Sequence, residues 1–256
     1  DIVRCGSRAY STNTLESGWI PSPLPAIYTG DGMVAEYRDY LGTDSLEAAG
    51  SLGGSFVSDD ISDYYVNPFE LGYDFYIGWK KDDFIGKAAL QKMKGAESNR
   101  KKVTFEWNRE DVLKVIASGF EEGTPYKWID FPQPNYASSS ADMIMDGDKM
   151  VGMSMFNGYS YNERRLLSLG VVSQDVNVGD VLTHKWGEPD GRSFSLRGRS
   201  YMSDKLKVAS ERWLAKNNIP AHEAELLPPA LLRNVQALRD NEVRQQRDRV
   251  HVPPPT

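Results

Sequence analysis

Short apolar segments separated by turns occupy the middle of the chain and constrain its fold more than any other feature. The clearest turn is Asp146–Lys149, which separates two methionine-rich runs, Met143–Met145 and Met150–Met155. A turn of this composition between two apolar runs is typical of a β-hairpin. Further strands are predicted over 103–107, 126–131, 166–172 and 180–186. Short strands at regular spacing predict a small barrel or a sandwich.

Alternating apolar residues also follow the turn Asn67–Pro68, from Phe69 to Trp79, and predict one more strand. Polar residues 80–83 then interrupt the pattern, and good helix formers predict a helix over 84–95. Other helices are predicted over 33–41, near Leu46, over 111–120 and 203–216, and from about residue 228. Helices and strands are therefore expected in separate regions, which is an α+β fold.

The start of the chain is expected to be a short strand, residues 1–10, followed by an ordered loop, residues 11–30. Alternate prolines in this loop restrict the backbone, and its apolar residues have something to pack against. Four side chains of the region suit a flat ligand with hydrogen-bonding edges: Tyr10, Glu16, Trp19 and Tyr28. The alternative is that these aromatic residues are ordinary parts of the protein interior.

Composition excludes several classes of protein and site. The 256-residue chain is 40% hydrophobic and 26% charged, as a globular protein is, and its net charge of −6 argues against a nucleic-acid partner. The single cysteine, Cys5, and the scattered histidines predict neither a disulfide nor a metal site. Residues 58–63 predict an Asx-rich turn rather than a calcium loop. No apolar run is long enough to span a membrane, and no signal peptide is visible, so a cytoplasmic protein is expected.

Polar residues 96–102 suggest a boundary between two lobes. The predicted parts are a first lobe over residues 1–98, a β-barrel lobe over residues 99–200 and a helical tail over residues 201–256.

Three motifs give the chain a resemblance to a known family. They are Leu15–Gly30, Gly53–Asp60, and Pro68–Gly72 followed by Asp83–Lys87. The chain resembles the aminomethyltransferase superfamily, typified by the glycine-cleavage T-protein, and within it the tetrahydrofolate-dependent aryl O-demethylases that act on vanillate, 3-O-methylgallate and syringate. The resemblance covers residues 8–90, is weaker over 150–188 and ends near residue 192. It implies the C-terminal part of a T-protein-like folate-binding fold, a small antiparallel β-barrel and C-terminal helices. Residues 1–98 would then be part of the folate- and substrate-binding lobe.

The resemblance also implies a reaction, namely methyl transfer from a methoxy-aromatic acid to tetrahydrofolate in the catabolism of lignin-derived aromatics. A catalytic tyrosine lies nine residues before a tryptophan in this branch, and Tyr10 and Trp19 have that spacing. The implied roles are catalysis for Tyr10, substrate binding for Tyr28, and cofactor binding for Glu16, Trp19, Glu70 and Trp79.

Two alternatives remain beside the demethylase. One is an aminomethyltransferase of the glycine-cleavage type or another tetrahydrofolate-dependent demethylase, and the other is a folate-binding module without turnover. The N-terminal half of the family fold is absent from this sequence, so its expected partner is that missing half of the same protein. The methoxy-arene, the oligomeric state and the role of the segment after Arg192 do not follow from the sequence.

Overall fold

The computed structural model describes residues 6–20, 30–42, 45, 53–96, 99–132 and 140–201. The chain divides into two compact units, Asp1–Tyr201 and Met202–Thr256, and every described residue belongs to the first. The predicted helices near Leu46, over 203–216 and from residue 228 lie outside the described residues, as does Tyr28.

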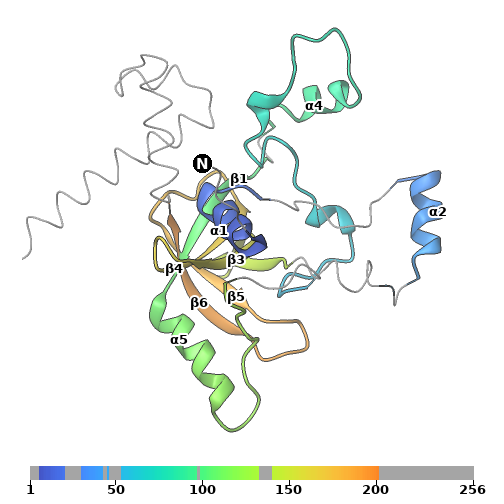
Figure 1. Ribbon diagram of the computed structural model, residues 1–256. Helices are drawn as coiled ribbons and strands as arrows, with labels where there is room; N and C mark the ends of the chain where they lie inside the picture. The colour runs from blue at the N-terminus through green and yellow to red at the C-terminus, as the bar shows by residue number, and fades with distance from the viewer. Residues whose placement is uncertain are drawn as a thin grey trace, which may run out of the picture. The chain divides into compact units, whose positions relative to one another are not determined.

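A closed antiparallel β-barrel is the largest element of the described residues (Figure 1). Its strands are β1 (Lys101–Trp107), β2 (Asp142–Asp146), β3 (Lys149–Ser160), β4 (Arg165–Val172), β5 (Val181–Trp186) and β6 (Phe194–Tyr201). They pair in the order β1-β4-β3-β2-β5-β6, and β6 closes the barrel on β1. The structure therefore confirms the α+β class and the predicted β2–β3 hairpin, and it decides between a barrel and a sandwich.

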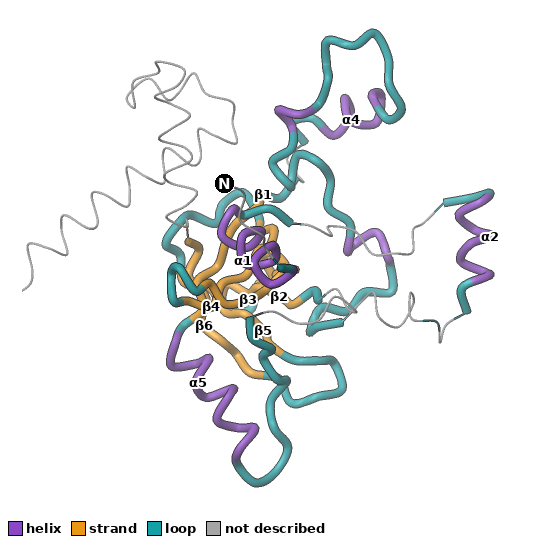
Figure 2. Tube along the Cα trace, in the orientation of Figure 1, coloured by secondary structure: helices purple, strands orange, loops and turns teal. Residues whose placement is uncertain are grey.

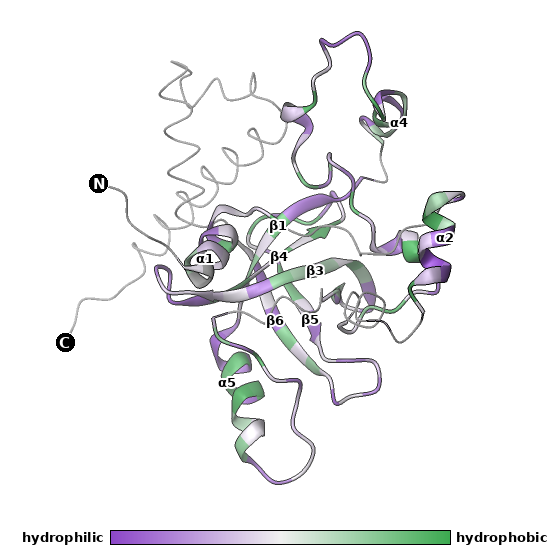
Figure 3. Cartoon of the chain, turned by 45° about the vertical axis from the view of Figure 1, so that its right-hand side comes forward, coloured by the Kyte–Doolittle hydropathy of each residue, from purple (hydrophilic) through white to green (hydrophobic). Residues whose placement is uncertain are grey.

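Strand β4 is buried on both faces, which explains its unbroken apolar sequence. Leu166 and Val172 belong to the core inside the barrel, whereas Leu167, Leu169 and Val171 belong to a second core on its outer face. Hydrophobic residues are visible on parts of the barrel strands and on α5 (Arg109–Ala117) in Figure 3. A Cβ atom at Gly170 would lie 2.1 Å from the Met153 carbonyl oxygen, so the close approach of β3 and β4 requires glycine there.

Most of the described helices precede the barrel in the sequence, and α5 lies between β1 and β2; Figure 2 colours helices and strands separately. Besides α5, the α-helices are α1 (Ser7–Ser17), α2 (Met33–Tyr40) and α4 (Lys87–Met93), and the 3₁₀ helices are η1 (Ile61–Tyr64), η2 (Asp74–Tyr76) and η3 (Ser118–Phe120). The helices predicted over 33–41, 84–95 and 111–120 are confirmed, the second in shorter form. The Asx turn is also confirmed, because Asp60 accepts hydrogen bonds from the backbone N–H and the hydroxyl of Ser62.

The predicted strand over residues 1–10 is wrong in its described part, and the predicted loop over residues 11–30 is wrong over residues 11–17. Residues 21–29 of that loop lie outside the described residues. Helix α1 runs through both predicted segments and ends at Gly18, whose left-handed backbone lets its N–H bond to the Leu15 carbonyl. The Ser, Thr and Asn residues of α1 favour a helix only weakly. Packing supplies the missing stability, because Leu15 is fully buried and α1 contacts β3 and β4.

The predicted strands over 69–79 and 126–131 are also wrong, and β6 was missed. Residues 68–76 form turns and η2, and the Asn67 side chain accepts bonds from the backbone N–H groups of Phe69 and Glu70. No described strand pairs with this segment, so its alternation reflects packing on the barrel rather than a sheet. Leu71, for example, is buried in the outer core.

Candidate functional site

Helix α1 is attached to the barrel through the buried side chain of Glu16, which is 3% exposed. The hydroxyl of Ser160, at the end of β3, donates to Glu16 Oε1 over 2.5 Å. The Asn162 amide, in the turn between β3 and β4, donates to both carboxylate oxygens over 3.0 and 2.9 Å. Both oxygens of Glu16 therefore accept hydrogen bonds from the barrel itself.

An aromatic cluster lies beside α1 and consists of Tyr10, Trp19, Tyr73 and Tyr76. The rings of Tyr10 and Trp19 meet edge to face with centroids 6.0 Å apart, and those of Tyr73 and Tyr76 with centroids 6.1 Å apart. Tyr10 is 49% exposed, Trp19 40% and Tyr76 74%. Exposed aromatic rings that gather in this way mark a surface for a ligand or partner.

Tyr73 connects the two halves of the aromatic cluster. Its hydroxyl is buried. Burial raises the pKa of the Tyr73 phenol, and a hydrogen bond with the Trp19 side chain opposes that rise only in part. Tyr73 therefore contacts Trp19 on one side and Tyr76 on the other.

Lys102, on β1, packs against the same cluster, with its Nζ 5.7 Å from the centre of the Tyr73 ring. Burial lowers the pKa of the Lys102 ammonium to about 8. The aromatic cluster therefore has a cationic neighbour whose charge is held in a partly desolvated place.

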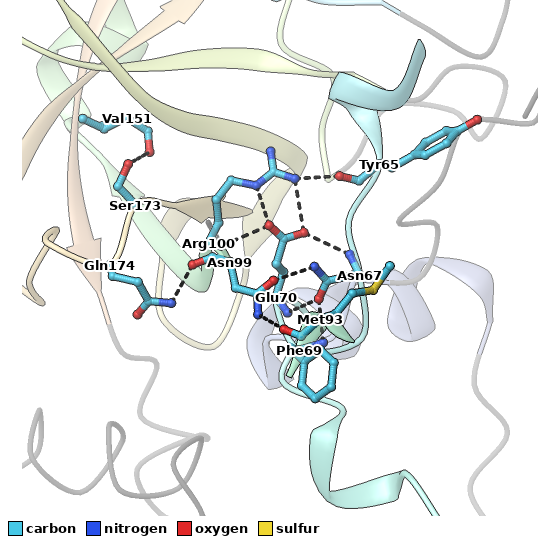
Figure 4. Close-up of polar contacts among 10 residues, drawn as sticks. All are labelled: Tyr65, Asn67, Phe69, Glu70, Met93, Asn99, Arg100, Val151, Ser173 and Gln174. Carbon is cyan, nitrogen blue, oxygen red and sulfur yellow. Dashed lines mark hydrogen bonds and ion pairs between the residues drawn. The ribbon is translucent and has the colours of Figure 1, made fainter. Parts of the chain in front are cut away.

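Glu70 belongs to a polar network with Arg100 (Figure 4). Glu70 Oε1 accepts from Arg100 Nε over 2.8 Å and from the Arg100 backbone N–H over 3.0 Å, and Oε2 accepts from the Asn67 backbone N–H over 2.9 Å. Arg100 also donates to the Tyr65 carbonyl. Burial raises the pKa of Glu70, but the bonds from Arg100 and Asn67 outweigh burial and hold the pKa below its ordinary value.

A cavity of about 600 Å³ adjoins this network. Its wall combines residues 65–68, one face of α4 with Leu90 and Met93, and the side chains of Asn99 and Arg100. Most of this lining is apolar, and the Glu70 carboxylate in its wall is engaged by Arg100.

The structure brings only part of the predicted site together. Tyr10 and Trp19 are in ring contact, while Glu16 extends from the same helix to the barrel. The ring of Trp79 stacks on that of Phe69 with centroids 6.4 Å apart, and the Lys94 ammonium lies over the Trp79 ring. Tyr28 lies outside the described residues.

Sequence reasoning missed Tyr73, Tyr76 and Lys102 as site residues. Tyr73 was predicted to lie on a strand, and Lys102 belongs to the polar segment 96–102 that was predicted to be a boundary between lobes. A lysine in such a segment carries no signal of its own.

The described residues contain no group of three or more His, Cys, Asp or Glu side chains able to hold a metal ion. None of their helices has the length and apolar character needed to cross a membrane.

The amino-acid sequence of the chain is similar to those of two enzymes. No family model matches the chain. It is 39% identical over 191 residues to syringate O-demethylase of Sphingobium sp., an alignment that covers 74% of this chain and 41% of that enzyme. It is 29% identical over 204 residues to sesamin methylene transferase of Sinomonas sp., covering 73% and 44%. The chain is therefore related to a demethylase and to a methylene transferase, and it spans less than half the length of either.

Proposed function

We propose that the protein containing this chain is a tetrahydrofolate-dependent O-demethylase acting on a methoxy-aromatic acid of the vanillate, syringate or 3-O-methylgallate type. The observation that carries the proposal is an exposed phenol, Tyr10, in ring contact with Trp19 in a chain related to syringate O-demethylase. Cytoplasmic catabolism of lignin-derived aromatics is the role that we propose for it.

The difficult step in such a reaction is the departure of a phenolate. The bond between the methyl carbon and the ether oxygen breaks, and its electron pair stays on that oxygen. Tetrahydrofolate, when bound, supplies the N5 atom to which the methyl carbon becomes bonded, with loss of the N5 proton to solvent. Tyr10 donates its phenolic hydrogen to the developing oxyanion, either as a hydrogen bond or as a transferred proton.

The aromatic cluster suits a flat ligand. Rings from α1, from Trp19 and from η2 offer stacking surfaces, and the exposed Tyr10 phenol offers a donor and an acceptor. This combination fits either the pterin of tetrahydrofolate or a methoxy-arene.

The two carboxylates that were predicted to bind the cofactor already accept hydrogen bonds from other side chains of the protein. Glu16 accepts from Ser160 and Asn162, and Glu70 accepts from Arg100. In our proposal these carboxylates hold α1 and the turn at residues 67–70 in position, and direct contact of Glu16, Glu70, Trp19 or Trp79 with the cofactor stays a prediction.

Replacing Tyr10→Phe in the complete protein tests the catalytic role. We expect turnover to fall by roughly 10²- to 10⁴-fold, the usual contribution of a positioned proton donor. The measurement is formation of 5-methyltetrahydrofolate from vanillate or syringate. Tyr161→Phe is the matched control, because Tyr161 is also exposed but contacts Tyr159 rather than the cluster. Equal turnover in wild type and Tyr10→Phe would remove Tyr10 from the mechanism.

The relationship to a methylene transferase favours a second candidate, transfer of a methylene group instead of a methyl group. The same assay separates the two, since the folate product then carries a methylene rather than a methyl group. Pterin binding with no folate product for any donor would indicate a binding module, the third alternative.

A further inference from the structure

Lys102 differs from the other lysines of the barrel region in having no polar partner. Among the described residues no hydrogen bond or ion pair involves its ammonium, and its one polar contact is with the Tyr73 ring face. Lysines that do have a side-chain or carbonyl partner include Lys87, Lys101, Lys127, Lys149 and Lys185.

The position of Lys102 follows from the alternation of β1. Val103, Phe105 and Trp107 contact the core inside the barrel, so Lys102 lies on the outer face. That face carries the segment with Gly72 and Tyr73, and a Cβ atom at Gly72 would lie 3.9 Å from the Lys102 Nζ. Gly72 contributes no side chain beside the ammonium.

Holding a cation in this place costs stability. Burial shifts the pKa of Lys102 to about 8, so at neutral pH the charged form is retained against a desolvation penalty. A charge kept at such a cost beside an exposed set of aromatic rings is typical of a binding site.

We propose that Lys102 recognises the carboxylate of a ligand that stacks on the aromatic cluster. The inference rests on the proposed function, which supplies two such carboxylates: that of the methoxy-aromatic acid and those of the glutamyl tail of tetrahydrofolate. An aromatic acid combines a flat ring with an anion at its edge, which matches the rings of Trp19 and Tyr73 with an ammonium beside them. We assign the acid substrate as the preferred source.

Calorimetric titration of the complete protein tests the assignment without requiring turnover. The probes are vanillate and 2-methoxyphenol, which share the methoxyphenol ring and differ in the carboxylate. We expect Lys102→Met to weaken vanillate binding by roughly 10- to 100-fold, the range for a charge-assisted hydrogen bond, and to leave 2-methoxyphenol binding within about twofold. Lys102→Arg retains the charge and should retain most of the preference for the acid.

Two controls separate this role from a structural one. Lys101→Met removes the neighbouring lysine, which donates to the Gln174 carbonyl, and should change neither affinity. Lys102→Met should also match or exceed the wild-type melting temperature at pH 7, because it removes the cost of the desolvated charge.

Titration with tetrahydrofolate and with 6-methyltetrahydropterin, which lacks the glutamyl tail, identifies the source of the carboxylate. Loss of tetrahydrofolate affinity alone in Lys102→Met would support carboxylate recognition and transfer it to the cofactor. Equal weakening of vanillate and 2-methoxyphenol, unchanged affinity for all four probes, or no binding of any probe to the wild type would overturn the inference. Normal probe binding without 5-methyltetrahydrofolate formation would instead contradict the proposed function and leave the role of Lys102 standing.

Discussion

The same pairing of a buried carboxylate with an arginine occurs in two regions of this molecule. Glu70 accepts bonds from the Nε, the guanidinium NH2 group and the backbone N–H of Arg100. Asp111 on α5 accepts bonds from the same three groups of Arg197 on β6. Both carboxylates are almost completely buried, with side-chain exposures of 6% and 5%.

The surroundings of the two pairs differ. Asp111 connects a helix to a strand, and the neighbouring Val112 and Val115 are buried in the barrel core. Glu70 connects turns that pair with no described strand, and its network continues through Asn67 to Asn99. Arg100 is also less exposed than Arg197, 24% against 51%.

The contribution of an ion pair to stability therefore depends on the other interactions that hold the same segment in place. In the barrel the pair adds to backbone ladders and to the packing of the inner core. Residues 65–73 form no ladder and are held by backbone bonds within their turns, by hydrogen bonds that involve side chains, and by the burial of Val66 and Leu71. We therefore expect unequal effects when each carboxylate is neutralised.

Glu70→Gln should have the larger effect, lowering the free energy of unfolding by about 2–4 kcal/mol. The change leaves Arg100 without its anion and places an amide N–H₂ against arginine donors. Urea denaturation measures the loss, and hydrogen exchange should show faster exchange at residues 65–73 while the barrel amides stay protected. Uniform acceleration across the barrel would contradict a local role.

Asp111→Asn should cost less, about 1–2 kcal/mol, because Arg197 can turn to solvent and α5 keeps its apolar contacts. The same urea titration provides the value. Glu110→Gln on the same helix turn is the matched control, since Glu110 is exposed and lies 3.6 Å from Arg197. A loss equal to that of Glu70→Gln would refute the distinction between the two regions.

Lowering the pH should change the stability of the folded protein least and most gradually. The pKa of Glu70 and that of Asp111 are both lowered in the folded protein, chiefly by their arginines once burial is counted against Glu70. A lowered pKa contributes stability that is present above the ordinary carboxyl pKa of about 4 and is lost as pH falls through the folded value. The difference in melting temperature between wild type and Glu70→Gln should therefore shrink as the pH falls below the ordinary carboxyl pKa, and a constant difference would exclude this linkage.

Local pattern predicted the β2–β3 hairpin and the strands β1, β4 and β5, because turn chemistry and apolar runs are properties of neighbouring residues. The turn at Asp146–Lys149 and the apolar run of β4 both identify strands within a few residues of their observed ends. Strand β6 was missed because Phe194–Tyr201 mixes arginine and serine with its apolar residues, and its partners β1 and β5 are needed to recognise it.

The candidate site was predicted in part for a similar reason. Tyr10 and Trp19 carry the spacing of a family motif, so the resemblance selected them. Tyr73 and Lys102 are distant in sequence from both, and only the packing of residues 71–73 on β1 brings them to the same cluster.

The amino-acid sequence by itself determined the α+β class, the β2–β3 hairpin and the spacing of Tyr10 and Trp19, because turn chemistry, alternation and motif spacing are local properties. Tertiary structure alone decided that residues 7–17 form a helix, that 69–79 form no strand and that Glu16 joins α1 to β3. It also decided where Lys102 lies. These outcomes depend on burial and on partners far away along the chain, and such contacts outweigh weak local preferences.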